Sequence, residues 1–305
     1  MSSRLVIKLT VWIALLSLLS AAVNVYFTYN QSRTLLIQSS QDKLATATRV
    51  LANRYAFFIE DIGKDLLFIS HLPAIREIAT SNSADAQLKR ERLGIALSQL
   101  LKPHDEYNQV RLIGAADHGR ELVRIDKTEN GLSIVEGLAL QEKAHYSYVY
   151  NTLKLKPGEV FISAIRLNKE RGLLDSYGKP SIIMATPIYT DDNTVFGAIV
   201  INVDLEKMFG MIETDIPNDI DIIATNSAGD YLLHPDTEKT FGFDKGIRFM
   251  IQQDLPAAQR IFSGERNDLV AEMQDLRMPQ KQAVISLTKV PFNRAADENY
   301  IVLGL

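Results

Sequence analysis

Residues 110–124, VRLIGAADHGRELVR, contain two short apolar runs on either side of a turn-forming cluster, Ala116-Asp117-His118-Gly119. Apolar runs that flank such a cluster are typical of a β-hairpin. A second stretch at 220–234, IDIIATNSAGDYLLH, repeats the pattern at a constant offset of 110 residues and aligns Gly229 with Gly119. Although any two hairpins can be matched in this way, the repeat indicates two related modules that each contain a β-sheet.

The two predicted hairpins differ where the first one carries charge. Arg111 aligns with Asp221, and Arg124 aligns with His234. If the two modules share a fold, their cavities therefore differ in chemistry.

Apolar and turn-forming segments around the hairpins predict the remaining elements. Further strands are expected at 159–167, 181–189, 195–203, 268–273, 282–289 and 300–303, and helices at 84–101, 204–212 and 246–262. Asp204 suits the N-cap of the second of these helices because its carboxylate accepts from exposed backbone N–H groups, and Glu206 follows in the first turn.

Toward the N-terminus, residues 9–29 contain no charge over 21 positions. This length is enough for one helix to cross a bilayer. Arg4 and Lys8 precede the apolar segment, so the positive-inside rule predicts a cytoplasmic N-terminus at 1–8 and export of everything after about residue 29. The alternative is a cleaved signal peptide, with Ser20-Ala21-Ala22 as the processing site.

A long stalk helix is expected to continue from this anchor over residues 30–75. No Pro or Gly lies between Gln31 and Ile62, and His71-Leu72-Pro73 ends or kinks the helix. One apolar stripe runs along it at helical spacing, formed by Leu44, Leu51, Tyr55, Phe58, Ile62, Leu66 and Ile69. The stripe is either a dimer seam or the face on which the globular domain packs, and packing is favoured for its distal half.

Composition excludes several classes of function. The 305 residues carry a net charge of −4 without a run of Lys or Arg, which gives no reason to expect nucleic acid binding. Without cysteine there are no disulfides, thiolate metal sites or cysteine nucleophiles, and the five histidines lack metal-ligand spacing. No phosphate loop or Gly-x-Ser-x-Gly motif is present. We therefore expect no catalytic residue, metal or cofactor in this region.

Side chains that donate hydrogen bonds gather in three segments of the first module. Arg, Lys, Tyr and Ser are the donors that bind a carboxylate, and Arg can bind it through two parallel hydrogen bonds. A pocket rich in these donors and poor in acids suits a small anionic metabolite. The alternative is that they pair with acidic residues at the surface. The candidate binding residues are Arg111, Arg124, Lys143, Tyr146, Tyr148, Ser163 and Arg166.

The order of anchor, long helix and two α/β modules resembles the double Cache extracytoplasmic sensors, and more narrowly those of bacterial sensor histidine kinases. The resemblance covers residues 31–303. It is carried by VRLI at 110–113, GRELVR at 119–124, LQEKAHYSY at 140–148, EVFIS at 159–163, ATPI at 185–188, GAIVIN at 197–202 and GDYLLHP at 229–235.

The resemblance implies an α+β fold, in which a transmembrane helix continues into a stalk helix followed by two stacked PAS-like antiparallel-sheet modules. The membrane-distal module, 76–212, would bind a small organic acid or amino acid through the seven candidate residues. The membrane-proximal module, 213–305, would end near a second membrane span that is missing from this sequence.

The resemblance also implies a receptor in the bacterial inner membrane, with residues after about 29 in the periplasm. It would be a homodimer through the stalk helix and would relay ligand binding to a missing output domain, a histidine kinase or a diguanylate cyclase. A ligand-free structural spacer and an exported enzyme remain as alternatives.

Overall fold

A computed structural model of the chain describes residues 2–80, 83–128, 131–167, 169–170, 173–174, 178–214, 216–217, 220–278, 280–292, 295–296, 298 and 300–305. The chain divides into two compact units, Met1–Ala47 and Thr48–Leu305. Each unit is described by itself.

Helix α1 (Ser2–Ser70) is 69 residues long and provides the whole of the first unit. Its N-terminal part contains an 18-residue window with a mean hydropathy of 1.9, long and apolar enough to cross a membrane. The apolar side chains in this window are exposed, as Trp12, Leu16 and Leu18 illustrate. The prediction of a long helix that begins with an apolar segment is confirmed.

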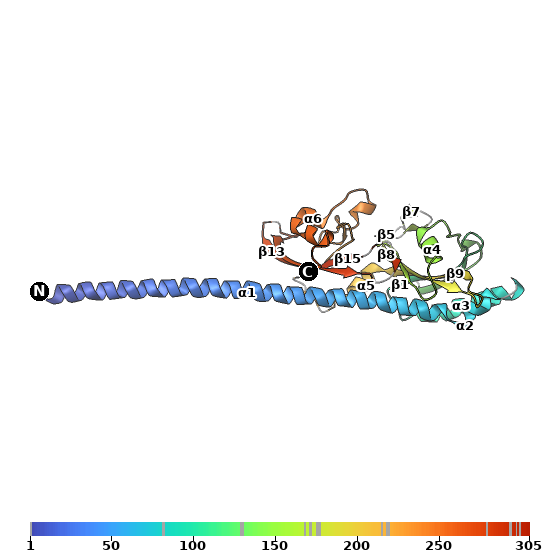
Figure 1. Cartoon of the computed structure of the whole chain (residues 1–305), viewed down its shortest axis with the longest axis horizontal. Helices are drawn as coiled ribbons and strands as arrows, with labels where there is room; N and C mark the ends of the chain where they lie inside the picture. The colour runs from blue at the N-terminus through green and yellow to red at the C-terminus, as the bar shows by residue number, and fades with distance from the viewer. Residues whose placement is uncertain are drawn as a thin grey trace. The chain divides into compact units, whose positions relative to one another are not determined.

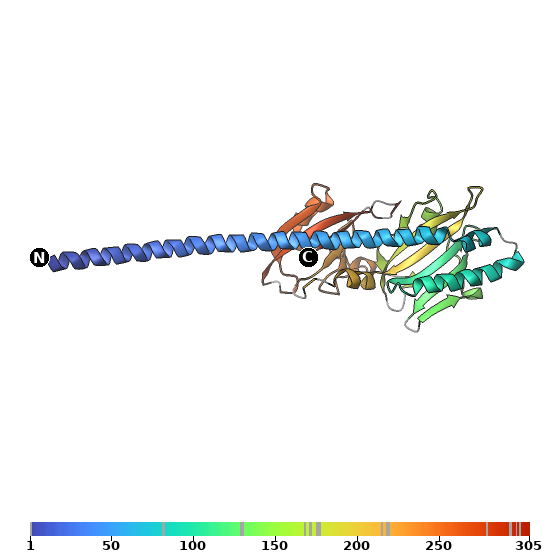
Figure 2. The same cartoon turned by 90° about the horizontal axis from the view of Figure 1, so that it is seen from below.

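In the second unit, the part of α1 after Thr48 packs on the sheets (Figure 2). Leu51, Tyr55, Ile62, Leu66 and Ile69 of the predicted stripe are buried, and the Tyr55 ring stacks on Phe209 with centroids 6.1 Å apart. This half of the stripe is therefore a packing face for its own domain. The helix ends at Ser70, and helix α2 (Pro73–Ala79) begins with Pro73, where a missing backbone N–H costs nothing.

The first sheet has the strand order β14-β4-β8-β9-β1-β2-β3, with β5 beside β8. Its strands β1, β5, β8 and β9 are labelled in Figure 1. Its strands are β1 (Tyr107–Gly114), β2 (Glu121–Thr128), β3 (Gly131–Val135), β4 (Phe161–Ile162), β5 (Arg166–Leu167), β8 (Pro180–Tyr189), β9 (Val195–Asp204) and β14 (Ala295–Ala296). Helix α3 (Ser83–Leu101) packs on β2, and the short η1 (Gly137–Ala139) and α4 (Ser147–Thr152) lie between β3 and β4 in sequence. A small separate ladder joins β6 (Lys169–Glu170) to β7 (Leu173–Leu174).

The second sheet has the order β11-β10-β15-β13-β12. Its strands are β10 (Ile223–Thr225), β11 (Tyr231–Leu233), β12 (Asp268–Gln274), β13 (Gln282–Pro291) and β15 (Tyr300–Gly304). Helix α5 (Leu205–Ile212) connects the two sheets, and the Asp204 side chain caps it by accepting from Lys207 N at 3.2 Å. The predicted α+β class with two sheets is thus confirmed.

The helix expected at 246–262 is wrong as a single element. In this range the structure has the short pieces α6 (Ile251–Asp254), η3 (Pro256–Ala258) and α7 (Gln259–Phe262), and the short η2 (Gly242–Asp244) precedes them. Leu255 is in an extended conformation directly before Pro256, which is the conformation that a following proline favours.

Each sheet contains one of the two expected hairpins, but their alignment needs a correction. In the first hairpin Ile113 pairs with Glu121, and in the second Thr225 pairs with Tyr231. The turn of the second hairpin is two residues shorter, so its first strand corresponds at an offset of 112. Arg111 therefore corresponds to Ile223 and not to Asp221.

The strand pairs between named strands are antiparallel within the described residues, apart from one. Strand β14 pairs in parallel with β4 at the edge of the first sheet, with Ala295 beside Phe161. Because β14 lies between β13 and β15 in sequence, the C-terminal part of the chain contributes to both sheets.

Candidate functional site

A cavity of about 590 Å³ lies against one face of the first sheet. It is lined by Arg111, Lys143, Tyr146, Ser147, Tyr148, Ser163, Ala164, Arg166, Leu167, Ser181, Ile183, Asn202, Asp244 and Glu298. Arg111, Asn202 and Ile183 come from the adjacent strands β1, β9 and β8, where alternate residues share a face. A volume of this size suits a small molecule.

Arg111 places a cation on the floor of the cavity although only 3% of it is exposed. Its Nη1 donates to Tyr148 Oη at 2.9 Å, and its Nε lies 3.5 Å from Glu121 Oε1. The Nε has no hydrogen-bond partner among the described residues. Because a guanidinium carries five N–H donors, Arg111 keeps donors for a further acceptor.

Lys143 is the second buried cation of the lining and is 2% exposed. Its Nζ donates to Gln141 Oε1 at 2.7 Å and lies 5.1 Å from the centroid of the Tyr146 ring. The backbone around it is fixed against the β1–β2 turn, since Lys143 N donates to Gly119 O at 2.9 Å. Gly119 has a φ of +69°, and a side chain there would collide with the backbone of Ala144. The turn that the sequence predicted therefore also positions Lys143.

The two tyrosines come from the start of α4. Tyr146 is the N-cap residue of this helix and Tyr148 lies in its first turn, with the two ring centroids 5.8 Å apart. Tyr148 is buried and packs with Val149 and Phe161 against β9. The start of α4 therefore brings two phenols to the side of the cavity where Arg111 lies.

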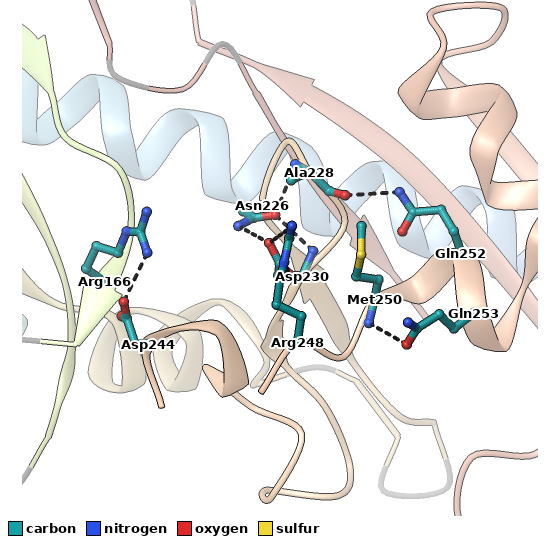
Figure 3. A network of polar contacts seen from close by, with 9 residues as sticks. All are labelled: Arg166, Asn226, Ala228, Asp230, Asp244, Arg248, Met250, Gln252 and Gln253. Atoms are coloured by element: carbon teal, nitrogen blue, oxygen red, sulfur yellow. Dashed lines mark hydrogen bonds and ion pairs between the residues drawn. The ribbon is translucent and has the colours of Figure 1, made fainter. Parts of the chain in front are cut away.

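Ser163 and Arg166 lie near the short strands β4 and β5. Ser163 Oγ accepts from Ile183 N at 2.9 Å, which joins this segment to β8. Arg166 Nη1 donates to Asp244 Oδ1 at 3.0 Å (Figure 3). Leu167 N also donates to Asp244, to Oδ2 at 2.9 Å. Asp244 therefore joins the region of the second sheet to the cavity.

A second carboxylate, Asp230, is held by its own partners in the same view. Arg248 Nε and Nη2 each donate to it at 2.7 Å, and Asn226 Nδ2 donates at 3.0 Å (Figure 3). Burial acts to raise the pKa of Asp230, but the hydrogen bonds from Arg248 and Asn226 outweigh it and hold the pKa below its usual value. This cluster stabilises the β10–β11 turn and does not line the cavity.

The structure brings together six of the seven residues predicted from the sequence, namely Arg111, Lys143, Tyr146, Tyr148, Ser163 and Arg166. The seventh, Arg124, lies outside the cavity lining. It is the Cα partner of Arg111 on β2, but its Nε donates to both carboxylate oxygens of Asp126, at 2.9 and 3.1 Å. The ion pair with Asp126 therefore holds the Arg124 side chain outside the cavity.

Sequence reasoning missed five polar residues of the lining: Ser147, Ser181, Asn202, Asp244 and Glu298. Asn202 ends the GAIVIN segment of β9, and its alternation with Val200 could have shown that it shares a face with Arg111. Asp244 and Glu298 lie in connections around the second sheet and carry no local signal. The expectation of a lining poor in acids is consequently wrong.

The described residues contain no group of three or more His, Asp and Glu side chains that could hold a metal ion. What the cavity offers is a set of cations, phenols and hydroxyls, together with two carboxylates. This set can bind a polar organic molecule by hydrogen bonds and ion pairs.

The chain belongs to the family described as bacterial histidine kinase, sensor domain, which matches residues 71–259, more than half of the chain. This family consists of sensor domains and not of catalytic domains, in agreement with the expectation from the sequence. Residues 71–259 are therefore a sensor domain of the bacterial histidine kinase type. No individual curated protein matches the chain in sequence.

Solved structures share the fold at low sequence identity. A domain of a Vibrio parahaemolyticus protein assigned to the sensory box/GGDEF family has a TM-score of 0.72 at 17% identity, over 88% of this chain and 96% of that one. The extracellular domain of vpHK1S-Z8, assigned as a histidine kinase, has a TM-score of 0.70 at 17% identity, over 88% and 91%.

A chemoreceptor ligand-binding domain is also similar. The domain of the amino acid chemoreceptor PctC from Pseudomonas aeruginosa PAO1, in complex with GABA, has a TM-score of 0.53 at 13% identity, over 88% of this chain and 99% of that one. The expected double Cache type of sensor is confirmed by the family match and these similarities.

Proposed function

We propose that this sensor domain detects a small metabolite through an anionic carboxylate group that binds in the cavity of the first sheet. The observation that carries the proposal is the burial of two cations, Arg111 and Lys143, in the lining of one cavity. Arg111 lies 3.5 Å from Glu121, and because its guanidinium carries five N–H donors it can bind a ligand carboxylate as well. The similarity to a domain that was solved with GABA supports a ligand of this size and type.

The apolar segment of α1 and the charges before it support the remaining features of the proposed receptor. Residues 9–29 anchor the chain in the bacterial inner membrane, with 1–8 in the cytoplasm and the rest on the periplasmic side. Residues 76–212 form the membrane-distal module, which binds the ligand, and residues 213–305 form the membrane-proximal module. The receptor is a homodimer through the stalk helix.

Signalling in this proposal requires a difference in ligand affinity between two states of the receptor. Ligand binding in the distal module would favour one state and shift the stalk helix or its dimer partner. The movement would pass through residues 204–305 toward an output domain. The relay can operate only if the distal module binds a ligand.

The test is a thermal-shift screen of the full chain in lipid nanodiscs against monocarboxylates, dicarboxylates and amino acids. A carboxylate ligand should raise the melting temperature, and the rise should grow with the logarithm of ligand concentration above its Kd, because the ligand binds the folded state and not the unfolded chain. Lys143→Ala should weaken the binding at least about 30-fold, since a charge-assisted contact in a desolvated site is worth about 2–5 kcal/mol.

Lys154→Ala is the matched control for this test. Lys154 also lies over a tyrosine ring, 3.5 Å from the centroid of Tyr150, but it is exposed and outside the cavity. Its replacement should leave ligand affinity unchanged. Turnover of a compound in the screen would favour an exported enzyme, and the absence of any shift would favour a ligand-free spacer; either result contradicts the proposal.

A further inference from the structure

We propose that segment 234–244, which runs from the end of β11 to the end of η2, opens when His234 binds a proton and then releases Asp244 from Arg166 and Leu167. The proton is then a second input to this sensor domain, separate from the ligand of the cavity. Because Asp244 and Arg166 line the cavity, acid would change the binding site through this segment. The inference does not depend on which ligand the cavity binds.

The hydrogen bonds of His234 fit a neutral ring. His234 is 3% exposed, and its Nδ1 accepts from Asp236 N at 2.9 Å. A ring nitrogen that accepts carries no proton, so the proton is assigned to Nε2, which is buried without a hydrogen-bond partner among the described residues. Protonation would place an N–H on Nδ1, opposite the N–H of Asp236. The Asp236 backbone must then turn, so that its oxygen, 3.2 Å from Nδ1, becomes the acceptor.

The titratable groups around His234 are Lys239, Asp254, Asp236 and Tyr231. Burial and the nearby Lys239 lower the pKa of His234 and outweigh the attraction from Asp254 and Asp236. The Asp254 carboxylate already accepts from Tyr231 Oη at 2.7 Å and from Lys239 Nζ at 3.4 Å. Burial and the bond to Asp254 raise the pKa of Tyr231, which therefore stays an uncharged phenol.

These groups give the direction of the pH effect. When the segment opens, the ring enters water, where the pKa of a histidine is about 6.5. In the closed segment the pKa of His234 is lower, so on acidification the open state binds a proton that the closed state does not. Acid therefore favours opening. While the closed state stays unprotonated, uptake of one proton raises the ratio of open to closed molecules about tenfold between pH 7.5 and 5.5.

Backbone hydrogen bonds connect Asp236 to Asp244. Asp236 O accepts from Lys239 N at 3.2 Å. Phe241 N donates to Tyr231 O at 3.0 Å, and Phe241 O accepts from Asp244 N at 3.1 Å. Phe241 has a φ of +54°, which is unfavourable for a bulky residue and persists because its side chain is buried. A turn of the Asp236 backbone would remove the support of this strained residue, and Asp244 would move with it.

The far end of the segment places Asp244 in the cavity lining. The carboxylate accepts from Arg166 Nη1 at 3.0 Å, as Figure 3 shows, although the Asp244 side chain is only 5% exposed. It also accepts from Leu167 N at 2.9 Å. Because the acceptor of this backbone N–H is the Asp244 side chain, hydrogen exchange of the Leu167 amide reports whether Asp244 is in place.

The test is hydrogen exchange of the full chain in nanodiscs at pH 7.5, 6.5 and 5.5, resolved to single amides and corrected for the intrinsic rate at each pH. The reporter amides are those of Phe241, Asp244 and Leu167, and the amides of β13 report unfolding of the whole domain. At pH 7.5 the reporters should be at least about tenfold less protected than β13, because the segment opens without unfolding the sheet. Their protection should fall about five- to tenfold from pH 7.5 to 5.5.

Two substitutions isolate His234. His234→Gln should remove the pH dependence of the reporters, because glutamine does not titrate. His71→Gln is the matched control, since His71 is exposed and lies outside the segment, and it should behave as wild type. Should His234→Gln fail to fold, Lys239→Met provides a second comparison. It removes the repulsion on the ring, so the closed state binds the proton more readily and the fall should shrink to less than about fivefold.

Each contrary result overturns a defined step. Equal protection of the reporters and β13 at every pH would show that the segment opens only when the domain unfolds. A fall that is the same in wild type and in His234→Gln, or in Lys239→Met if that comparison is used, would exclude His234 as the proton acceptor. A fall at Phe241 and Asp244 without one at Leu167 would exclude the release of Asp244. None of these results bears on carboxylate binding, which the thermal-shift screen tests separately.

Discussion

Replacement of Arg111 by methionine should destabilise the domain and abolish ligand binding, and the two effects should be separable. Arg111 and Glu121 are 3% and 1% exposed, and their charged atoms approach to 3.5 Å. Removal of one member of a buried ion pair costs about 3–5 kcal/mol because the remaining charge is uncompensated. Arg111 therefore also has a structural role, through its buried pairing with Glu121.

The lower end of that range applies here. After Arg111→Met, Glu121 would still accept from Gln141 N at 3.0 Å and would lie 3.7 Å from Arg124 Nη1. We therefore expect a loss of about 3 kcal/mol in the free energy of unfolding. For a domain of this size each kcal/mol lowers the melting temperature by about 2–4 °C, so the shift should be about 6–12 °C.

The double variant Arg111→Met/Glu121→Gln separates stability from binding. Glutamine keeps an oxygen for Gln141 N but carries no charge, so about 2 kcal/mol of the loss should be recovered. Differential scanning calorimetry measures stability, and titration with a carboxylate ligand measures binding, which should remain absent in both variants. A double variant no more stable than Arg111→Met would refute the ion-pair reasoning, and normal ligand binding by either would refute the ligand role.

Three further outcomes are expected. Tyr55→Ala should lower the free energy of unfolding by about 3–5 kcal/mol, because the Tyr55 ring is fully buried. Phe57→Ala is the control: the Phe57 side chain is 65% exposed, so the change should be less than about 0.5 kcal/mol. Chemical denaturation measures both values. Asp204→Ala should cost about 1 kcal/mol through loss of the α5 cap, with Asp204→Asn nearly neutral in the same assay. Burial lowers the pKa of His234 from its usual value of about 6.5. Below pH 6.5 the unfolded chain therefore binds a proton that the folded chain does not, and the free energy of unfolding decreases as the pH is lowered. Melting temperatures from pH 7.5 to 5.5 should therefore fall more steeply for wild type than for His234→Gln, and equal slopes would contradict this.

Patterns that depend on neighbours in sequence predicted much of the architecture. The uncharged segment at 9–29, the apolar stripe from Leu51 to Ile69 and the turn at Gly119 each depend on local chemistry, and each corresponds to the element that was expected. Arg111 and Lys143 were both predicted as binding residues, and the hydrogen bond from Lys143 N to Gly119 O beside the first turn brings their segments together in the structure.

What the sequence alone determined is therefore the long helix, the two hairpins and the basic residues Arg111, Lys143 and Arg166 of the cavity. Tertiary structure alone decided that Arg124 is held by Asp126 outside the lining, and that the second hairpin has a turn two residues shorter. It also brought Asp244 and Glu298, far away in sequence, to the same cavity. Such contacts follow from the packing of one part of the chain on another, and packing between distant segments leaves no periodic signal in either of them.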